Sequence, residues 1–155
     1  MNSIILYHVR PMTDGDLDAV MAIEVESSAS PWNYEHFQHE LTAPHSWPLV
    51  AVEVSRIIGY ICLMSLFEEA QILNIAVLPD RRGRGVAKML LERAISRALD
   101  AGAEVMALEV RASNSNAIAL YERFGFKQVG IRTRYYDAAE DAILMEKIIR
   151  SNVYS

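Results

Sequence analysis

Arg82-Gly83-Arg84-Gly85-Val86-Ala87 is the stretch that decides the fold, because it joins a strand-like run to a helix-like run. The strand-like run is Ile72 to Val77, and the helix-like run is Lys88 to Ala101. Two glycines allow the turn between them to aim several successive backbone N–H groups into one small space. The unpaired amides at the start of the helix and the positive end of its dipole point there too. Such a turn suits a pyrophosphate, so the sequence predicts a phosphorylated cofactor.

The spacing of the glycines excludes two common cofactor motifs. A dinucleotide-binding G-x-G-x-x-G that began at Gly83 would need a third glycine where Lys88 stands. A phosphate-binding G-x-x-x-x-G-K-[ST] loop would need a second glycine and a hydroxyl residue after the lysine, and neither is present. What is left is R-x-x-G-x-A, at Arg82, Gly85 and Ala87. By itself this hexapeptide is equally typical of an ordinary glycine turn that caps a helix.

Composition predicts one globular domain over residues 1–155. Hydrophobic residues make up 52% of the 155-residue chain and charged residues 23%, which is enough to build a core. The formal net charge of −5 argues against a general nucleic-acid binder. Basic residues nevertheless cluster locally at Arg81, Arg82, Arg84 and Lys88, where a phosphate would lie. The absence of a long apolar run and of a signal-like N-terminus predicts a cytoplasmic protein with no membrane association. The single cysteine, Cys62, lies in an apolar run and is interpreted as a small core residue.

The hydrophobic pattern predicts a mixed α/β sheet with helices on both faces. Asp14 or Asp16 is expected to cap the first helix, and Pro44 and Pro48 to bracket a loop. A ligand is expected at the carboxyl ends of the central strands, beside the glycine turn. The predicted strands are Ile4 to Arg10, Leu49 to Val54, Ile57 to Leu66, Ala70 to Val77, Val105 to Val110, Lys127 to Tyr136 and Ala142 to Ile149, and the predicted helices are Leu17 to Glu24, Tyr34 to Leu41, Lys88 to Ala101 and Asn116 to Phe124.

Five further segments accompany the glycine turn. They are Asn74-Ile75-Ala76-Val77-Leu78-Pro79, Leu108-Glu109-Val110-Arg111-Ala112-Ser113-Asn114, Ala117-Ile118-Ala119-Leu120-Tyr121-Glu122-Arg123-Phe124-Gly125-Phe126, Ser30-Pro31-Trp32, and Arg134-Tyr135-Tyr136 ahead of Glu140-Asp141-Ala142. Together they resemble the GNAT acetyltransferases, whose sheet has about seven strands and which bind acetyl-coenzyme A. The run L-E-V-R-A-S-N followed by A-I-x-L-Y-x-x-x-G-F narrows the resemblance to the RimI-type protein N-terminal alanine acetyltransferases. The resemblance covers nearly the whole chain.

Two residues are candidates for the proton transfers of acetyl transfer. An α-amino group has a pKa of about 7.7–8.0, so much of it must lose a proton before it can attack a thioester. Glu109 is the candidate base, acting directly or through water, and the alternative is a surface carboxylate in a salt bridge. The resemblance assigns Tyr121 as proton donor to the departing thiolate, since a phenol of pKa about 10 holds its proton at pH 7. The alternative for Tyr121 is an aromatic packing residue, although Leu120 and Phe124 could fill that role.

The resemblance also implies which residues bind the two substrates. Backbone N–H groups of Ile75, Ala76 and Val77 would bond the pantetheine chain and the thioester oxygen, and Asn114 would cap a helix and bond the cofactor. Trp32, Tyr135 and Tyr136 would line the peptide side. The implied peptide is the N-terminus of the eighteenth small-subunit ribosomal protein, acetylated by direct transfer without a covalent enzyme intermediate. The pyrophosphate would lie on Gly83, Arg84, Gly85, Val86, Ala87 and Lys88.

Several alternatives stay open from the sequence. The same cofactor half would serve a GNAT enzyme that acetylates lysine side chains or a small amine such as a polyamine. A non-catalytic acyl-CoA-binding module is a further alternative, although binding alone would need neither Glu109 nor Tyr121. His36 and His39, with Glu40, have a spacing seen in metal sites, but no third ligand follows and no metal is expected. The chain is expected to be a monomer or a weak dimer.

Overall fold

The computed structural model describes residues 7–136 and 140–150, and at residues 134–136 it describes the backbone without the side chains. Strands outnumber helices in the first half of the chain and are interspersed with them later, as the hydrophobic pattern predicts. The strands are β1 (Tyr7–Pro11), β2 (Ser46–Glu53), β3 (Arg56–Leu66), β4 (Glu69–Val77), β5 (Val105–Arg111), β6 (Lys127–Tyr136) and β7 (Glu140–Ile148). The helices are α1 (Leu17–Ser27), α2 (Tyr34–Thr42), α3 (Val86–Asp100) and α4 (Ser115–Arg123), with short 3-10 helices η1 (Asp14–Asp16) and η2 (Pro79–Arg81).

The described strands form one seven-stranded mixed sheet in the order β1-β2-β3-β4-β5-β7-β6. β4 and β5 run parallel, and Ile72 lies opposite Leu108. β1 with β2, β2 with β3, β5 with β7, and β6 with β7 are antiparallel pairs. The predicted fold class, a mixed sheet of about seven strands with helices on both faces, is confirmed.

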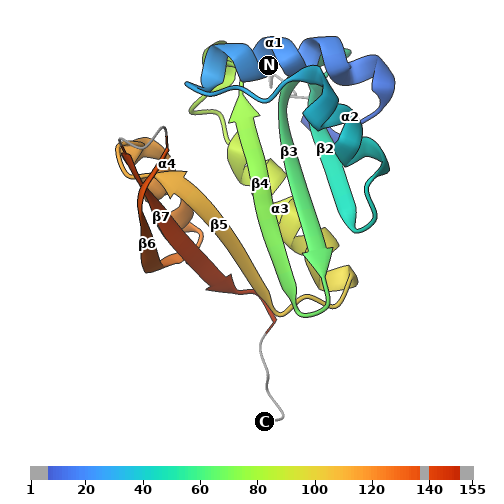
Figure 1. The fold of residues 1–155 in the computed structure, drawn as a ribbon. Coiled ribbons are helices and arrows are strands. Elements are labelled where there is room, and N and C mark those ends of the chain that lie inside the picture. Colours follow the sequence, from blue (N-terminus) through green and yellow to red (C-terminus); the bar gives the residue numbers. More distant parts are fainter. Residues whose placement is uncertain (1–6, 137–139, 151–155) are drawn as a thin grey trace, which may run out of the picture. The chain divides into compact units, whose positions relative to one another are not determined.

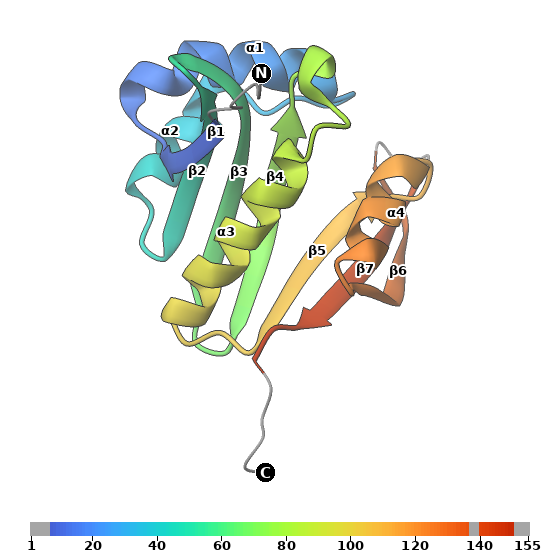
Figure 2. The same ribbon diagram turned by 180° about the vertical axis from the view of Figure 1, so that it is seen from behind.

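The chain forms two compact units. Unit 1 consists of Met1–Met64 and Asn74–Arg97, and unit 2 consists of Ser65–Leu73 and Ala98–Ser155. In unit 1, α1 and α2 lie on one face of the strands, as Figure 1 shows. α3 crosses the other face (Figure 2). In unit 2, α4 covers one face of β5, β7 and β6 (Figure 2).

α3 shows why these residues form this architecture. Val86, Leu90, Ala94 and Ala98 recur every four residues, and all four are buried. Such spacing gives a helix one apolar stripe that it can bury only against a neighbouring layer. The helix ends at Asp100, one residue before the predicted end, and the predicted stop residue Gly102 follows with a φ of 94°, which suits glycine.

The predicted boundaries need small corrections. α3 begins at Val86, two residues before the predicted start, and β2 begins at Ser46, so that Pro48 lies inside a strand and not at the end of a loop. Asp16 precedes α1, but its carboxylate makes no cap bond to that helix and instead accepts hydrogen bonds from Thr13 and Arg10. Cys62 is buried in β3, as predicted. The sequence predicts a polar connection from Asp137 to Asp141 between the last two strands; residues 137–139 lie outside the described residues, and Glu140 and Asp141 belong to β7.

Candidate functional site

The glycine turn has the backbone conformation that the sequence predicts for an anion site. Gly83 and Gly85 have φ angles of 76° and 82°, which side chains other than glycine adopt only with strain. A Cβ at either position would meet nothing within 4 Å, so the backbone conformation alone demands glycine here. α3 begins immediately afterwards, and its first helical bond runs from Met89 N–H to the Gly85 carbonyl at 3.0 Å. The amides of the first turn of this fifteen-residue helix are therefore available to an anion.

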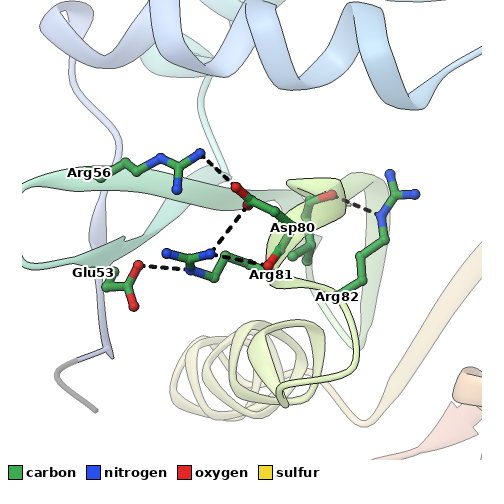
Figure 3. Close-up of polar contacts among 6 residues, drawn as sticks. Glu53, Arg56, Asp80, Arg81 and Arg82 are labelled. Atoms are coloured by element: carbon green, nitrogen blue, oxygen red, sulfur yellow. Dashed lines mark hydrogen bonds and ion pairs between the residues drawn. The ribbon is translucent and has the colours of Figure 1, made fainter. Parts of the chain in front are cut away.

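Two of the four basic residues near the turn are engaged with the protein itself, as Figure 3 shows. Arg81 bonds Glu53 with its Nε at 2.8 Å, and this bond raises the pKa of the guanidinium. Arg82 bonds the Val77 carbonyl through Nε at 3.1 Å and Ser27 Oγ through Nη2 at 3.3 Å. These side chains fasten the turn to neighbouring segments of unit 1. The local basic cluster predicted to face a phosphate is therefore reduced to Arg84 and Lys88, which are both exposed.

The carboxyl half of β4 carries Ile75, Ala76 and Val77 in unit 1. Ile75 and Ala76 are half-buried and Val77 is buried. The neighbouring strand β3 has a buried glycine, Gly59, at which a Cβ would lie 3.0 Å from the Ala76 carbonyl oxygen. Close approach of the two backbones therefore fixes this part of β4.

Glu109 lies in unit 2 on the face of β5 opposite the buried residues Leu108 and Val110. Its side chain is 32% exposed and forms an ion pair with Arg132 of β6, with 3.0 Å between Oε1 and Nη2. The pair reaches across β7, where Leu144 lies opposite both Glu109 and Gly130. This salt bridge is the structural alternative that the sequence left open for Glu109.

α4 positions Tyr121 and Asn114 in unit 2. Asn114 is the N-cap of the helix, and its Oδ1 accepts from Ala117 N–H at 3.2 Å, so the predicted capping role is confirmed. Tyr121 is only 6% exposed, and its ring packs against Phe126 with centroids 5.8 Å apart. The expectation that Leu120 and Phe124 provide the packing in its place is wrong, because Tyr121 is the buried residue of α4.

The turn between β5 and α4 is held by a residue that the sequence did not single out. Glu140, at the start of β7, accepts from Ser113 N–H at 2.7 Å and from Arg111 Nη1 at 3.2 Å. The hydrogen bonds from Ser113, followed by that from Arg111, lower the pKa of Glu140 below its usual range. Glu140 therefore holds the backbone that leads into the Asn114 cap.

The residues predicted on the peptide side are only partly described. Trp32 is half-buried in unit 1, and its ring lies 5.1 Å from that of Phe37 and 5.7 Å from that of His36. Tyr135 and Tyr136 end β6, and their side chains lie outside the described residues. His36 is part of the N-terminal cap of α2, since its Nδ1 accepts from Asn33 N–H at 3.1 Å.

The comparison of the sequence with protein families decides the classification. The model of the acetyltransferase (GNAT) family matches residues 17–126. The chain belongs to the GNAT family. This confirms the resemblance drawn from the glycine turn and its companion segments.

Similar proteins extend the match over almost the whole GNAT chain. A putative ribosomal protein bS18-alanine N-acetyltransferase of Bacillus subtilis is 39% identical over 139 residues, which are 88% of this chain and 92% of that protein. The ribosomal protein bS18-alanine N-acetyltransferase of Salmonella typhimurium is 39% identical over 133 residues, or 84% and 89% of the two chains. The crystal structure of the ribosomal-protein-S18-alanine N-acetyltransferase of Escherichia coli superposes with a TM-score of 0.86 at 33% identity, covering 97% of this chain and all of that one.

The GNAT chain also holds a buried residue that the sequence-based search passed over. Glu24 of α1 accepts hydrogen bonds from Trp32 N–H and from two residues of neighbouring strands. It lies seven residues after Leu17 and four after Val20, on the helix face that is buried. An acidic residue in a core-facing register was the signal that could have identified it. None of the helices in the described parts of the chain is long and apolar enough to cross a membrane.

Proposed function

We propose that this chain is an acetyl-CoA-dependent acetyltransferase that acetylates the N-terminal alanine of ribosomal protein bS18. The observation that carries the proposal is 39% identity, over nearly the full length of both chains, to proteins named for that reaction. The glycine turn supports the cofactor assignment, because its two positive-φ glycines open onto the start of α3. The ribosomal substrate of the relatives favours a cytoplasmic location, and we expect a monomer or weak dimer without direct nucleic-acid contact.

The residues of the turn fit the pyrophosphate of acetyl-CoA. We assign its contacts to the backbone of Gly83 to Ala87 and to the exposed side chains of Arg84 and Lys88. The Asn114 side chain and backbone N–H groups of Ile75, Ala76 and Val77 would bond other parts of the cofactor. A thioester supplies an activated acetyl group when it is bound. We further propose that residues 1–155 act as one catalytic domain.

Glu109 and Tyr121 have complementary roles in this proposal. Glu109 takes the proton that the α-ammonium group of the peptide must lose, and Tyr121 gives its phenolic proton to the departing thiolate. The neutral nitrogen forms the new bond to the acetyl carbon as the carbon–sulfur bond breaks, and Tyr121 protonates the thiolate as it leaves. The second proton that this nitrogen loses returns to the Tyr121 oxygen, so coenzyme A departs as the thiol and no covalent enzyme intermediate is needed. Trp32, Tyr135 and Tyr136 are assigned to the peptide.

A coenzyme A release assay with three amines tests the substrate assignment. The amines are a peptide that begins Ala-Arg, the same peptide with a blocked N-terminus and one lysine, and spermidine. Turnover confined to the free alanine terminus is expected. Turnover on lysine or spermidine alone would keep the acetyltransferase and reject the N-terminal substrate. Acetyl-CoA binding without turnover of any amine would favour a non-catalytic binding module.

Two substitutions test the catalytic assignment. Glu109→Gln and Tyr121→Phe are each expected to lower kcat by about 100-fold or more, the usual scale of general acid–base catalysis, with little change in acetyl-CoA affinity. Glu146→Gln, which changes an exposed carboxylate on the neighbouring strand β7, serves as the matched control. If Glu109→Gln and Arg132→Met had equal, small effects on kcat, Glu109 would be only the partner of the observed salt bridge.

A further inference from the structure

Glu24 places a carboxylate in the interior of unit 1. It lies on the buried face of α1 beside Val20 and Ile23, and it is 2% exposed. An ionised carboxylate accepts hydrogen bonds and donates none, and it is costly to bury unless donors surround it. The donors around Glu24 therefore explain why it can occupy the core.

Three donors from three different segments converge on Glu24. Trp32 donates its backbone N–H to Oε2 at 2.8 Å, and Asn74 donates Nδ2 to Oε1 at 3.1 Å. The hydroxyl of Tyr60, which is fully buried in β3, also donates to Oε1. One side chain of α1 therefore ties together the segment that leads into α2, the strand β3 and the strand β4.

Aromatic packing makes this arrangement stiff. The Trp32 ring lies 5.1 Å from Phe37, and Phe37 meets Tyr60 edge-on at 5.5 Å. Burial, and then the bond to Glu24, raises the pKa of Tyr60, so its hydroxyl keeps the proton that it donates. Trp32 and Tyr60 are thus linked in two ways, by their hydrogen bonds to Glu24 and by their ring contacts with Phe37.

We propose that Glu24 is a positioning residue for acetyl transfer, fixing the Trp32 segment and the Ile75–Val77 segment in one arrangement. Asn74 directly precedes Ile75 in β4, and Trp32 is the residue assigned to the peptide. The peptide segment and the amides assigned to the thioester thus share one buried anchor. This inference rests on the proposed function, since the roles of Trp32 and of Ile75 to Val77 belong to it.

Glu24→Gln distinguishes positioning from simple space filling. Glutamine keeps the shape of the side chain but has one acceptor oxygen, whereas the donors use both carboxylate oxygens. With the amide oxygen toward Tyr60 and Asn74, its NH₂ group faces Trp32 N–H, and a backbone N–H has no acceptor to offer. With the glutamine amide rotated by 180°, its NH₂ group faces Asn74, whose own amide must rotate to offer its oxygen in place of Nδ2. One of the two anchored segments is disturbed in either case.

The kinetic test compares Glu24→Gln with Glu40→Gln. Glu40 of α2 is also buried and accepts from Ser46 Oγ at 2.8 Å, so its substitution is a matched change of a buried carboxylate elsewhere in unit 1. We expect kcat/KM for the Ala-Arg peptide to fall by about tenfold in Glu24→Gln, the scale of one hydrogen bond to a charged group, and to change less than twofold in Glu40→Gln. Equal effects of the two variants would overturn the proposal.

Amide hydrogen exchange gives a second readout that does not depend on activity. The Trp32 N–H, protected by Glu24 in the wild type, is expected to exchange at least about tenfold faster in Glu24→Leu, which has no acceptor in any orientation. Faster exchange with unchanged kcat/KM would reduce Glu24 to a structural residue and overturn the proposal. A wild type that acetylates none of the three amines would instead contradict the proposed function, and faster exchange would then still support the anchoring of Trp32.

Asn74→Leu keeps the test decisive if Glu24→Gln fails to fold. It keeps the branched, four-atom shape of the side chain, removes the hydrogen bond from β4 to Glu24 and leaves the groups that form the bond from Trp32 to Glu24 in place. The expected result is a KM for acetyl-CoA raised by about fivefold or more with the KM for the peptide unchanged. Unchanged kinetics in this variant would contradict the coupling of Glu24 to the Ile75–Val77 segment.

Discussion

Replacing Gly59 with alanine is expected to push on β4 at the residues assigned to the cofactor. Gly59 is buried in β3, and an added Cβ would lie 3.0 Å from the Ala76 carbonyl oxygen and 3.4 Å from both Leu90 Cδ1 and Val77 Cγ2. A flexible side chain could move aside from such a contact. The Ala76 oxygen belongs to the backbone of a strand, so β4 itself must shift by a few tenths of an ångström.

The expected cost follows from two opposing effects. Overpacking a buried position costs about 1–3 kcal/mol. Alanine also restricts the unfolded chain more than glycine, which returns about 0.4–1 kcal/mol. The free energy of unfolding should therefore fall by about 1–2 kcal/mol. For a chain of this size this lowers Tm by about 2–8 °C.

The assay combines thermal unfolding with the KM for acetyl-CoA. Gly59→Ala is expected to lower Tm within that range and to raise the KM severalfold, because Ala76 carries one of the amides assigned to the cofactor. Gly15→Ala is the control, since a Cβ there would meet only Thr13 Oγ1 at 3.8 Å. A Tm at or above that of the wild type would refute the steric reasoning. A lower Tm with an unchanged KM would refute the assignment of this part of β4.

Three further predictions concern stability. Asp16→Asn should lower the free energy of unfolding at pH 7 by about 1–2 kcal/mol, because Asp16 accepts from Arg10 at 2.8 and 2.9 Å and from Thr13 N–H at 2.8 Å. The hydrogen bond from Arg10 holds the pKa of Asp16 below its ordinary value, so the wild type should lose this advantage as the pH falls below about 4; urea unfolding at several pH values checks it, and a pH-independent gap would contradict it. Asn114→Ala should cost about 1 kcal/mol through loss of the α4 cap, measured by chemical denaturation, and no loss would show that the cap is dispensable. Leu90→Ala, in the core stripe of α3, should cost about 2–5 kcal/mol, and a cost under 1 kcal/mol would place Leu90 outside the core.

The sequence predicted those parts of the molecule that depend on local pattern. The spacing of apolar residues in α3 is a property of one helix. The two glycines of the turn indicate positive φ angles, which few other residues adopt. The cap at Asn114 and the C-terminal Gly102 depend equally on neighbours a few residues away. In each case the deciding contacts lie within about one turn of the chain.

Most of the features that the sequence did not predict depend on contacts between residues far apart in the chain. Arg81 and Arg82, which the sequence grouped with the anion site, bond Glu53 and Ser27, which lie 28 and 55 residues away. Glu24 is one of several acidic residues of the first helix in the sequence, and only the fold brings Tyr60 and Asn74 to it. The charge and the type of a residue can be taken from a sequence, but the distant residue with which it forms a hydrogen bond or ion pair cannot.

Glu109 shows why kinetics must decide between two roles for the same residue. A carboxylate with 32% exposure, paired with an arginine that is 51% exposed, forms the kind of ion pair that contributes only about 0–1 kcal/mol. A substrate ammonium group can therefore take the place of Arg132 beside Glu109 at little cost in free energy. The observed salt bridge is thus compatible with two roles for Glu109: a purely structural residue, or a base that pairs with Arg132 between turnovers. Only the base predicts that removing the carboxylate lowers kcat far more than removing its arginine partner.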